Sequence, residues 1–426
     1  MVVSIVRSCF LVIVGLVSFG IARAQSTTWN GSISTAWEDS GNWSSGVPDS
    51  TKDAVIALAT NAPTIGAANA DTRALTVQSG ATLTLDASYA LHVFTGLTIN
   101  SGGTLTSNGV VDVDGSVSLG NATAVWNSGA GTHTVSGSWT SSGGAVVGTG
   151  VIKFDGSGTS ALTMGAGTSI SNVEVAKTSG TMLLSESAVV ATTHTLAIPG
   201  NLTVTSGTLQ VDFFNNSGGI ADGAQITVAG NFLQTGGTTT LTKQAGSGEE
   251  STDFARLDVE GDITVSGGLL SMANAEADVF CAGNWDTSAS GVFDPTLGLV
   301  TLDDGGVVTC LASAFANVTL SNGTDTSVSV PLFRRSVVIN SGSLLTLNAA
   351  TTQLGTLGGT LSILSGGALD SPGLLDVDGS LSLGNTRPSG RPTARCTRCR
   401  AIGRRAAARS RMGRRRSSST AVVLRR

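Results

Sequence analysis

The chain has few of the residue types from which enzymes build active sites. Of its 426 residues, 4% are aromatic and 12% are charged, and there are three histidines and one tyrosine. His92, His133 and His194 are far apart, and no motif pairs them with a nucleophile or a carboxylate. We find no Gly-x-Ser-x-Gly elbow between a strand and a helix, no phosphate loop and, before residue 386, no zinc-spaced cluster. The sequence therefore predicts no catalytic, cofactor-binding or metal-ligating residue, no cofactor and no enzymatic activity.

Helix-forming patterns are also missing. After the first 25 residues no long stretch has the apolar spacing of an amphipathic helix, which argues against a helix-rich fold. The chain is instead rich in Thr, Ser and Val and contains 56 Gly. Thr and Val favour strands, and Gly suits tight turns. The composition therefore indicates an all-β protein.

One stretch of the sequence occurs twice. Residues 96–121 (GLTINSGGTLTSNGVVDVDGSVSLGN) align with residues 360–385 (TLSILSGGALDSPGLLDVDGSLSLGN) without a gap, at an offset of 264. Each copy consists of short apolar/polar alternations broken by Ser-Gly-Gly or Asp-Gly, a pattern typical of strands separated by turns. Repetition of such units predicts coils that stack on one another.

Shorter repeats fill the region between the two copies. Gly200, Gly230 and Gly261 each begin a Gly-Asn or Gly-Asp strand motif, at intervals of 30 and 31 residues. A second repeat type begins with Gly-Ser-Trp at Trp139 and recurs as Gly-Asn-Trp at Trp285. Such intervals suit the coils of a right-handed parallel β-helix, or β-solenoid, over residues 72–385. Because a solenoid grows by stacking, we expect one elongated domain.

The N-terminal segment has the pattern of a secretory signal peptide. Residues 1–24 contain Arg7, an apolar run from Cys9 to Ile21 and the small-x-small sequence Ala22-Arg23-Ala24. This pattern predicts export with cleavage after Ala24. The alternative is a membrane anchor, for which the apolar run is short.

Three of the six tryptophans follow the signal peptide. Trp29, Trp37 and Trp43 lie in TWNGSISTAWEDSGNWSSGVPDSTKDAVI, residues 28–56. This entry sequence and the later repeats resemble bacterial secreted β-solenoids, namely autotransporter passenger domains and filamentous-haemagglutinin-like surface proteins. The resemblance implies an exported β-solenoid whose first coil, within residues 25–71, carries a Trp-rich cap over its stacking face. The alternative is that the same indoles stack on carbohydrate.

Three local features leave alternatives open. Asp112-Val-Asp114-Gly and Asp376-Val-Asp378-Gly invite a calcium interpretation, but two carboxylates before a glycine are few for a calcium loop. Residues 243–256, which include the adjacent Glu249 and Glu250, read as a solvated surface loop.

The last feature is a pair of cysteines, Cys281 and Cys310, whose separation of 29 residues is about one coil. They could form a disulfide if their side chains align in stacked coils, or remain two buried thiols.

The C-terminal tail changes character abruptly. Residues 386–426 contain 14 Arg and no acidic residue. When the tail is read in a shifted frame, its codons permit Trp, His and a second Trp at the spacings 7 and 13 that separate Trp126, His133 and Trp139 after the first copy. Inserting one missing base before this segment would restore the alignment with the first copy. The tail is therefore interpreted as a frameshifted translation that is disordered and has no evolved function. We also expect that the segment that would have carried a sorting signal for translocation machinery is missing.

Charge and fold together indicate a function class. Ten Lys and Arg but all 29 acidic residues precede residue 386, which gives that part a net charge of −19 and argues against nucleic acid as a partner. We expect an adhesin-like or structural protein on a bacterial surface that contacts a surface or matrix ligand, with carbohydrate as one candidate. The alternative is a carbohydrate-binding or carbohydrate-active protein, since pectin-lyase-like enzymes share the β-solenoid fold. A groove lined with carboxylates and aromatic residues would favour that alternative.

Overall fold

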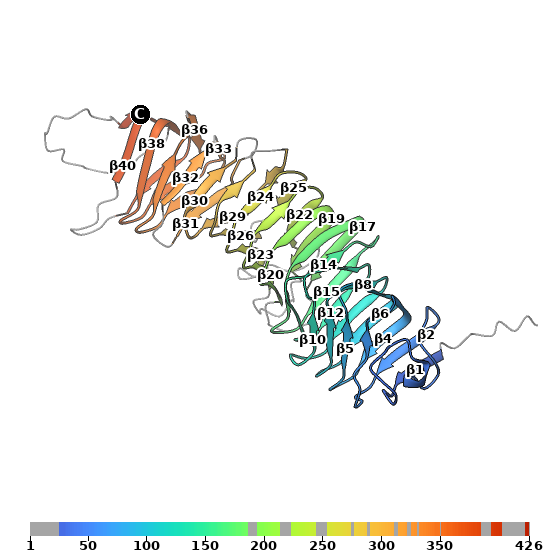
Figure 1. Cartoon of the computed structure of the whole chain (residues 1–426). Coiled ribbons are helices and arrows are strands. Elements are labelled where there is room, and N and C mark those ends of the chain that lie inside the picture. Colours follow the sequence, from blue (N-terminus) through green and yellow to red (C-terminus); the bar gives the residue numbers. More distant parts are fainter. Residues whose placement is uncertain are drawn as a thin grey trace, which may run out of the picture.

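The computed structural model describes residues 25–185, 194–213, 223–243, 254–273, 277–287, 290–310, 314–321, 325–329, 332–349, 351–384, 393–402 and 422–425. These residues form a long rod of stacked parallel strands (Figure 1). The one helical element in this part of the chain is the 3-10 turn η1 (Ser40–Asn42). The prediction of an all-β parallel solenoid is confirmed.

Each complete coil of the rod has three strand positions, which we call faces I, II and III in chain order. Face I is a 15-stranded sheet. It contains β3 (Thr64–Ile65), β5 (Thr82–Leu85), β7 (Thr104–Ser107), β10 (Val125–Asn127), β13 (Ala145–Val147), β16 (Ser169–Ile170), β18 (His194–Ile198), β20 (Gly223–Val228), β23 (Phe254–Val259), β26 (Ala277–Cys281), β29 (Leu299–Leu302), β31 (Asn317–Leu320), β34 (Val337–Ile339), β37 (Thr360–Ile363) and β39 (Ser380–Leu383).

Faces II and III together form a 26-stranded sheet, because six long strands run around the corner between them. These six are β4 (Ala70–Val77), β6 (Ala90–Ile99), β17 (Val173–Ser185), β19 (Leu202–Phe213), β38 (Ala368–Val377) and β40 (Thr393–Ile402). Face II also contains β8 (Val110–Val113), β11 (Thr132–Val135), β14 (Val151–Phe154), β21 (Phe232–Gln234), β24 (Ile263–Val265), β27 (Trp285–Asp286), β30 (Gly306–Thr309), β32 (Asp325–Ser329) and β35 (Leu344–Leu347). Face III also contains β1 (Gln25–Trp29), β2 (Lys52–Ile56), β9 (Ser116–Leu119), β12 (Trp139–Ser141), β15 (Ser160–Met164), β22 (Thr238–Lys243), β25 (Leu269–Met272), β28 (Val292–Asp294), β33 (Leu332–Phe333), β36 (Thr351–Leu354) and β41 (Val422–Arg425).

Side-chain alternation builds the core. In β5, Leu83 and Leu85 point inward and are fully buried, whereas Thr82 and Thr84 are partly exposed. Parallel pairing in register then places Leu83 against Leu105 of the next coil. Since every coil repeats this two-residue period, the apolar side chains form one continuous column along the rod.

The corner between faces I and II is held by a ladder of amide and carboxylate side chains. The Oδ1 atom of each member accepts a hydrogen bond from the backbone N–H of the next, at 2.8 Å from Asn172 to Asn201, 2.8 Å from Asn201 to Asn231, 2.8 Å from Asn231 to Asp262 and 2.7 Å from Asp262 to Asn284. The corner N–H groups, which lie outside the strands, are thereby satisfied from coil to coil.

The glycine that precedes each ladder residue after Asn172 has a steric reason. A Cβ atom at Gly230 would lie 2.5 Å from Asn201 Oδ1, and one at Gly283 would lie 2.6 Å from Asp262 Oδ1. A larger residue would push the ladder side chain of the preceding coil out of position. The Gly-Asn and Gly-Asp motifs of the sequence are thus corner motifs, and their strands pair in register, with Leu202 against Phe232 and Phe232 against Ile263.

The two long sequence copies do not occupy equivalent faces. In the first copy, residues 104–107 are β7 on face I and residues 110–113 are β8 on face II. In the second copy, residues 368–371 begin β38 on face II and residues 374–377 end it on face III. Trp139 and Trp285 also occupy different faces, because Trp139 lies on face III and Trp285 on face II. The sequence repeat therefore marks a strand-and-turn unit rather than a fixed place in the coil.

The N-terminal cap closes the first coil. Trp29, Trp37 and Trp43 are buried, and the ring of Trp43 packs edge-on against both others at centroid distances of 5.1 and 4.7 Å. The cap chain also pairs with strand edges, through a bridge from Trp29 to Trp43 beside β1 and one from Ala36 to Thr64 beside β3. The Trp-rich segment thus covers the first coil, and it hides backbone edges as well as apolar surface.

The Arg-rich tail differs in part from its prediction. Residues 386–426 were predicted to have no defined fold, yet within them β40 pairs with β38 and β41 pairs with β40, both in parallel. An open strand edge presents unpaired N–H and C=O groups, which the next segment of chain can satisfy whatever its side chains are. Residues 1–24, 386–392 and 403–421 lie outside the described residues, so the signal peptide and the frameshift remain predictions.

Candidate functional site

One cluster of metal-ligating side chains lies on the outer surface of face II. It contains His92 from β6 and Asp112 from β8, which are register partners on neighbouring coils, and Asp114 just after β8. Their ligand atoms all lie within 4.8 Å of one another. His92 and Asp112 are 20 residues apart in the chain, so only the coil length brings them together. We call this group the His92 cluster.

The imidazole of the His92 cluster faces both carboxylates through the same atom. His92 Nε2 lies 3.0 Å from Asp114 Oδ2 and 3.9 Å from Asp112 Oδ2. The side chains are about one-third to one-half exposed, so water and ions reach them. In a strand, residues two apart share a face, which is why Asp112 and Asp114 point the same way.

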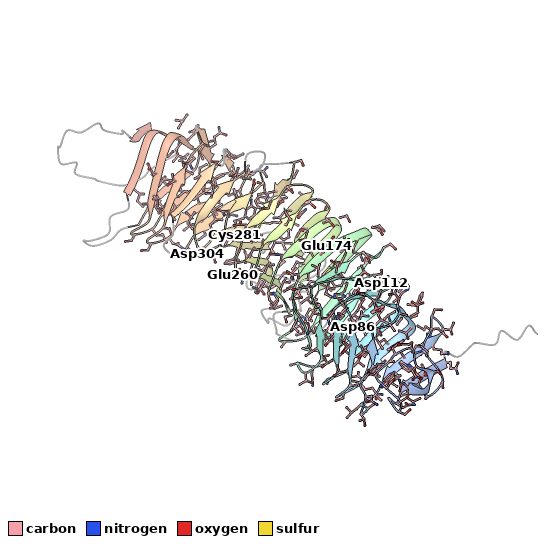
Figure 2. The ribbon with its side chains drawn as sticks, in the orientation of Figure 1. Asp86, Asp112, Glu174, Glu260, Cys281 and Asp304 are labelled. Atoms are coloured by element: carbon pink, nitrogen blue, oxygen red, sulfur yellow. The ribbon has the colours of Figure 1, made fainter. Side chains whose placement is uncertain are left out.

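Neighbouring side chains orient the His92 cluster. Thr134 Oγ1, one coil further along, donates a hydrogen bond to Asp112 Oδ1. The ring of Phe94 packs on the ring of His92 at a centroid distance of 3.9 Å. Asp112 and Glu174 lie along the same side of the rod (Figure 2), because Thr134 and Lys153 connect them in register.

A second polar group lies on the outer surface of face I. Arg256 stacks between two aromatic rings, with its guanidinium 4.2 Å from the Phe254 centroid and 4.7 Å from the Phe280 centroid. Its Nη2 atom donates to Asp278 at 3.1 Å. Burial raises the pKa of Asp278, and the bond to Arg256 opposes that shift. We call these four residues the Arg256 cluster.

The tryptophans singled out in the sequence are packing residues. The indole N–H of Trp29 donates to the Asn61 carbonyl at 2.7 Å, and that of Trp43 donates to the Trp37 carbonyl at 2.7 Å. Trp139 and Trp285 are fully buried. Because a sugar-binding indole must present its face to solvent, the carbohydrate-stacking interpretation of the cap tryptophans is wrong.

The cysteines Cys281 and Cys310 form no disulfide. Cys281 ends β26 on face I, where it pairs with Val259 and Leu302, whereas Cys310 follows β30 on face II. A separation of 29 residues is therefore not one coil here. Burial raises the pKa of the Cys281 thiol to about 12, and Asp303 and Asp262 add to the shift. Such a thiol is unreactive at neutral pH. Figure 2 shows Cys281 with Glu260 and Asp304 near it.

His133 belongs to a buried polar network inside the solenoid. Its Nδ1 accepts from the backbone N–H of Val111 at 3.1 Å, so the proton of the neutral ring is on Nε2, which donates to the Ser128 carbonyl at 2.8 Å. The Trp126 ring lies 5.3 Å away and donates to Ser107. Burial lowers the pKa of His133, and the bond to Ser128 only partly offsets this.

Lys177 is a second buried group that sequence reasoning missed. Its side chain has no exposed surface, and its Nζ donates to Ser160 Oγ at 2.8 Å. Burial lowers the pKa of Lys177, and the charge of Asp155 opposes the shift. The residue lies where the pairing of β17 with β19 is irregular, at the corner between faces II and III. No sequence pattern marks this corner.

The remaining predicted features fall elsewhere. In the second copy Asp376 is the register partner of Gln353, so no imidazole faces it. Glu249 and Glu250 lie outside the described residues, and the predicted loop 243–256 is shorter at both ends, because Lys243 ends β22 and Phe254 begins β23. Among the described residues, no helix is both long and apolar enough to cross a membrane.

Comparison with known proteins yields one family match. Residues 28–141 match the model of a domain of unknown function (DUF8693). The match begins in the cap and ends with β12, so it includes the His92 cluster and covers less than half of the chain. No curated protein matches the sequence. A search of solved structures found no match either.

Proposed function

We propose that this protein is an exported β-solenoid of the bacterial cell surface or extracellular space, with a structural or adhesin-like role. The observation that carries the proposal is its repetitive outer surface. On face III one outward column reads Thr76, Thr98, Ser118, Thr140 and Thr163 on five consecutive coils in register. Such a column presents hydroxyl groups about 4.8 Å apart along the rod, the spacing of paired strands.

Two further points support this assignment. The cap and the regular stack make the rod a rigid spacer, because each coil is stabilised by its neighbours. The sequence resembles autotransporter passenger domains and filamentous-haemagglutinin-like proteins, and its first 24 residues have the pattern of a signal peptide. The parallel β-solenoid fold is compatible with a protein that has no enzymatic activity.

Cell fractionation tests the proposal. Mass spectrometry of the extracellular or periplasmic fraction should find a chain that begins at Gln25, and protease added to intact cells should degrade it. Deleting the gene should reduce attachment of the cells to a surface. A chain that keeps Met1 and stays in the cytoplasm would contradict the proposal.

The Arg256 cluster favours carbohydrate binding as a second candidate function. It combines two partly exposed aromatic rings with a guanidinium and a carboxylate on one outer face, groups that can stack on a sugar ring and hydrogen-bond its hydroxyls. Replacing Phe254 and Phe280 with Ala should reduce retention on polysaccharide affinity gels. Phe94→Ala, which removes a partly exposed ring on face II, is the matched control. Equal retention of all three proteins would remove this candidate.

A further inference from the structure

We propose that the His92 cluster binds one divalent transition-metal ion of the Zn²⁺ class, which links two neighbouring coils. The ligands are His92 Nε2 and one carboxylate oxygen each from Asp112 and Asp114. Imidazole and carboxylate are both ordinary zinc ligands, and a site with three protein ligands leaves a fourth position for water. The inference does not depend on where the protein resides or on what it adheres to.

The distances suit such an ion. Around a tetrahedral zinc with bonds of about 2.0–2.1 Å, neighbouring ligand atoms lie about 3.4 Å apart. The two distances from His92 Nε2, 3.0 Å to Asp114 and 3.9 Å to Asp112, fall on either side of that value. Small rotations of exposed side chains are enough to equalise them. Thr134 and Phe94 then act as the outer neighbours that orient a metal ligand.

The local charge balance is a separate argument for a cation. At two other places on the surface an outward carboxylate lies against a permanent cation, Asp53 against Arg73 at 2.6 Å and Glu174 against Lys153 at 3.3 Å. In the His92 cluster two carboxylates share one imidazole. Two like charges held this close repel each other unless a positive charge lies between them.

The ligand set selects the class of metal. Calcium takes six to eight oxygen ligands and magnesium keeps near-octahedral oxygen coordination, so neither gains from an imidazole nitrogen. Imidazole suits zinc, copper, nickel and iron. The calcium interpretation of Asp112-Val-Asp114 is thus replaced by one in which the third ligand comes from the preceding coil.

The chain carries its own control. The second copy repeats Asp376-Val-Asp378, but the register partner of Asp376 is Gln353, whose amide is a poor zinc ligand. The cluster in the first copy should therefore bind zinc, and the second copy should not. Asp378→Asn is the matched control for Asp114→Asn.

Isothermal titration of the purified full chain with zinc chloride tests the site. The titration uses a background with Cys396→Ser and Cys399→Ser, so that the tail thiols do not contribute. We expect one high-affinity equivalent, at least a tenfold loss of affinity in His92→Gln and in Asp114→Asn, and no change in Asp378→Asn. Zinc should also raise the midpoint of thermal unfolding in the parent chain and not in His92→Gln.

Several outcomes would overturn the proposal. The parent chain could show no binding, in which case His92 forms an ordinary ion pair with the two carboxylates. Binding could survive His92→Gln unchanged, which would place the ion elsewhere. Calcium chloride could bind more tightly than zinc, which would return the pair of carboxylates to an oxygen-only site. Far-UV circular dichroism of each variant confirms that it is folded, and His92→Gln changes a partly exposed residue.

Discussion

The two sequence copies differ in place and in surroundings, although their strand patterns are almost the same. Asp112 of the first copy lies on face II with His92 before it and Thr134 after it. Asp376 of the second copy lies on face III with Gln353 before it and Arg400 after it. The same Asp-Val-Asp-Gly sequence thus belongs to a candidate metal site in one place and not in the other. In a solenoid, chemistry depends on register partners, and these come from the coil length rather than from the motif.

The largest expected effect is on the free energy of unfolding, and it differs between the cores of the two copies. Val113→Asp should lower the free energy of unfolding by about 3–5 kcal/mol, because an unpaired charge would be buried between two coils. Val377→Asp should cost less, since Val377 lies near the last described coil of the regular stack. Urea denaturation followed by circular dichroism measures both. Val110→Asp, in the same strand but 44% exposed, is the control and should be close to neutral.

Acid should weaken the first copy more than the second, because His133 packs against β8. The folded state lowers the pKa of His133 below its ordinary value of 6.5, so the unfolded chain binds the proton more readily. The resulting stability is complete above about pH 6.5 and is lost as pH falls toward the folded pKa, with a slope of up to about 1.4 kcal/mol per pH unit. Protonation would also set an Nδ1–H against the Val111 N–H.

Denaturation at pH 7.5 and 5.5 measures this effect. His133→Leu should be less stable at neutral pH and should lose the steep part of the pH dependence, whereas His92→Gln should keep it. Hydrogen exchange, corrected for intrinsic rates, should show faster opening of residues 104–135 at pH 5.5 with residues 360–384 little changed. Equal pH dependence in parent and His133→Leu would refute the assignment.

In the corner ladder, which lies between the two copies in the chain, the same motif always occupies the same corner of the coil. Asn231→Ala removes the acceptor for the Asp262 N–H and should cost about 1 kcal/mol. Asp262→Asn keeps the acceptor and should be nearly neutral. Thermal unfolding of the three proteins gives the ranking. A ladder that served no structural purpose would give the same midpoint for Asn231→Ala and the parent.

The smallest effect concerns the tail beside the second copy. Deleting residues 386–426 removes β40 from the edge of β38 and should speed hydrogen exchange in residues 368–384. Residues 90–135 should be unchanged, because coils contact only their neighbours. The deletion should also increase aggregation, since it exposes a strand edge. Unchanged exchange in β38 would mean that the pairing with β40 contributes nothing.

The strand-and-turn units, the all-β class and the cap can be predicted from the residues alone. Alternation in Thr82–Leu85 predicts one buried and one exposed side, because it depends only on a period of two. Gly-Asn pairs mark where strands begin, but the corner ladder they build needs the preceding coil. The burial of Trp139 and Trp285 could also be predicted, since each is a large apolar residue at the start of a repeated strand motif.

Only the folded coils bring His92 to Asp112, separate Cys281 from Cys310 and rotate the second copy by one face. Each of these arrangements depends on how many residues each coil contains. In the stack that number ranges from 18, between Val300 and Val318, to 31, between Gly230 and Gly261. Turns vary in length with little cost as long as the next strand finds its register, so the spacing between two residues does not reveal which face each one reaches.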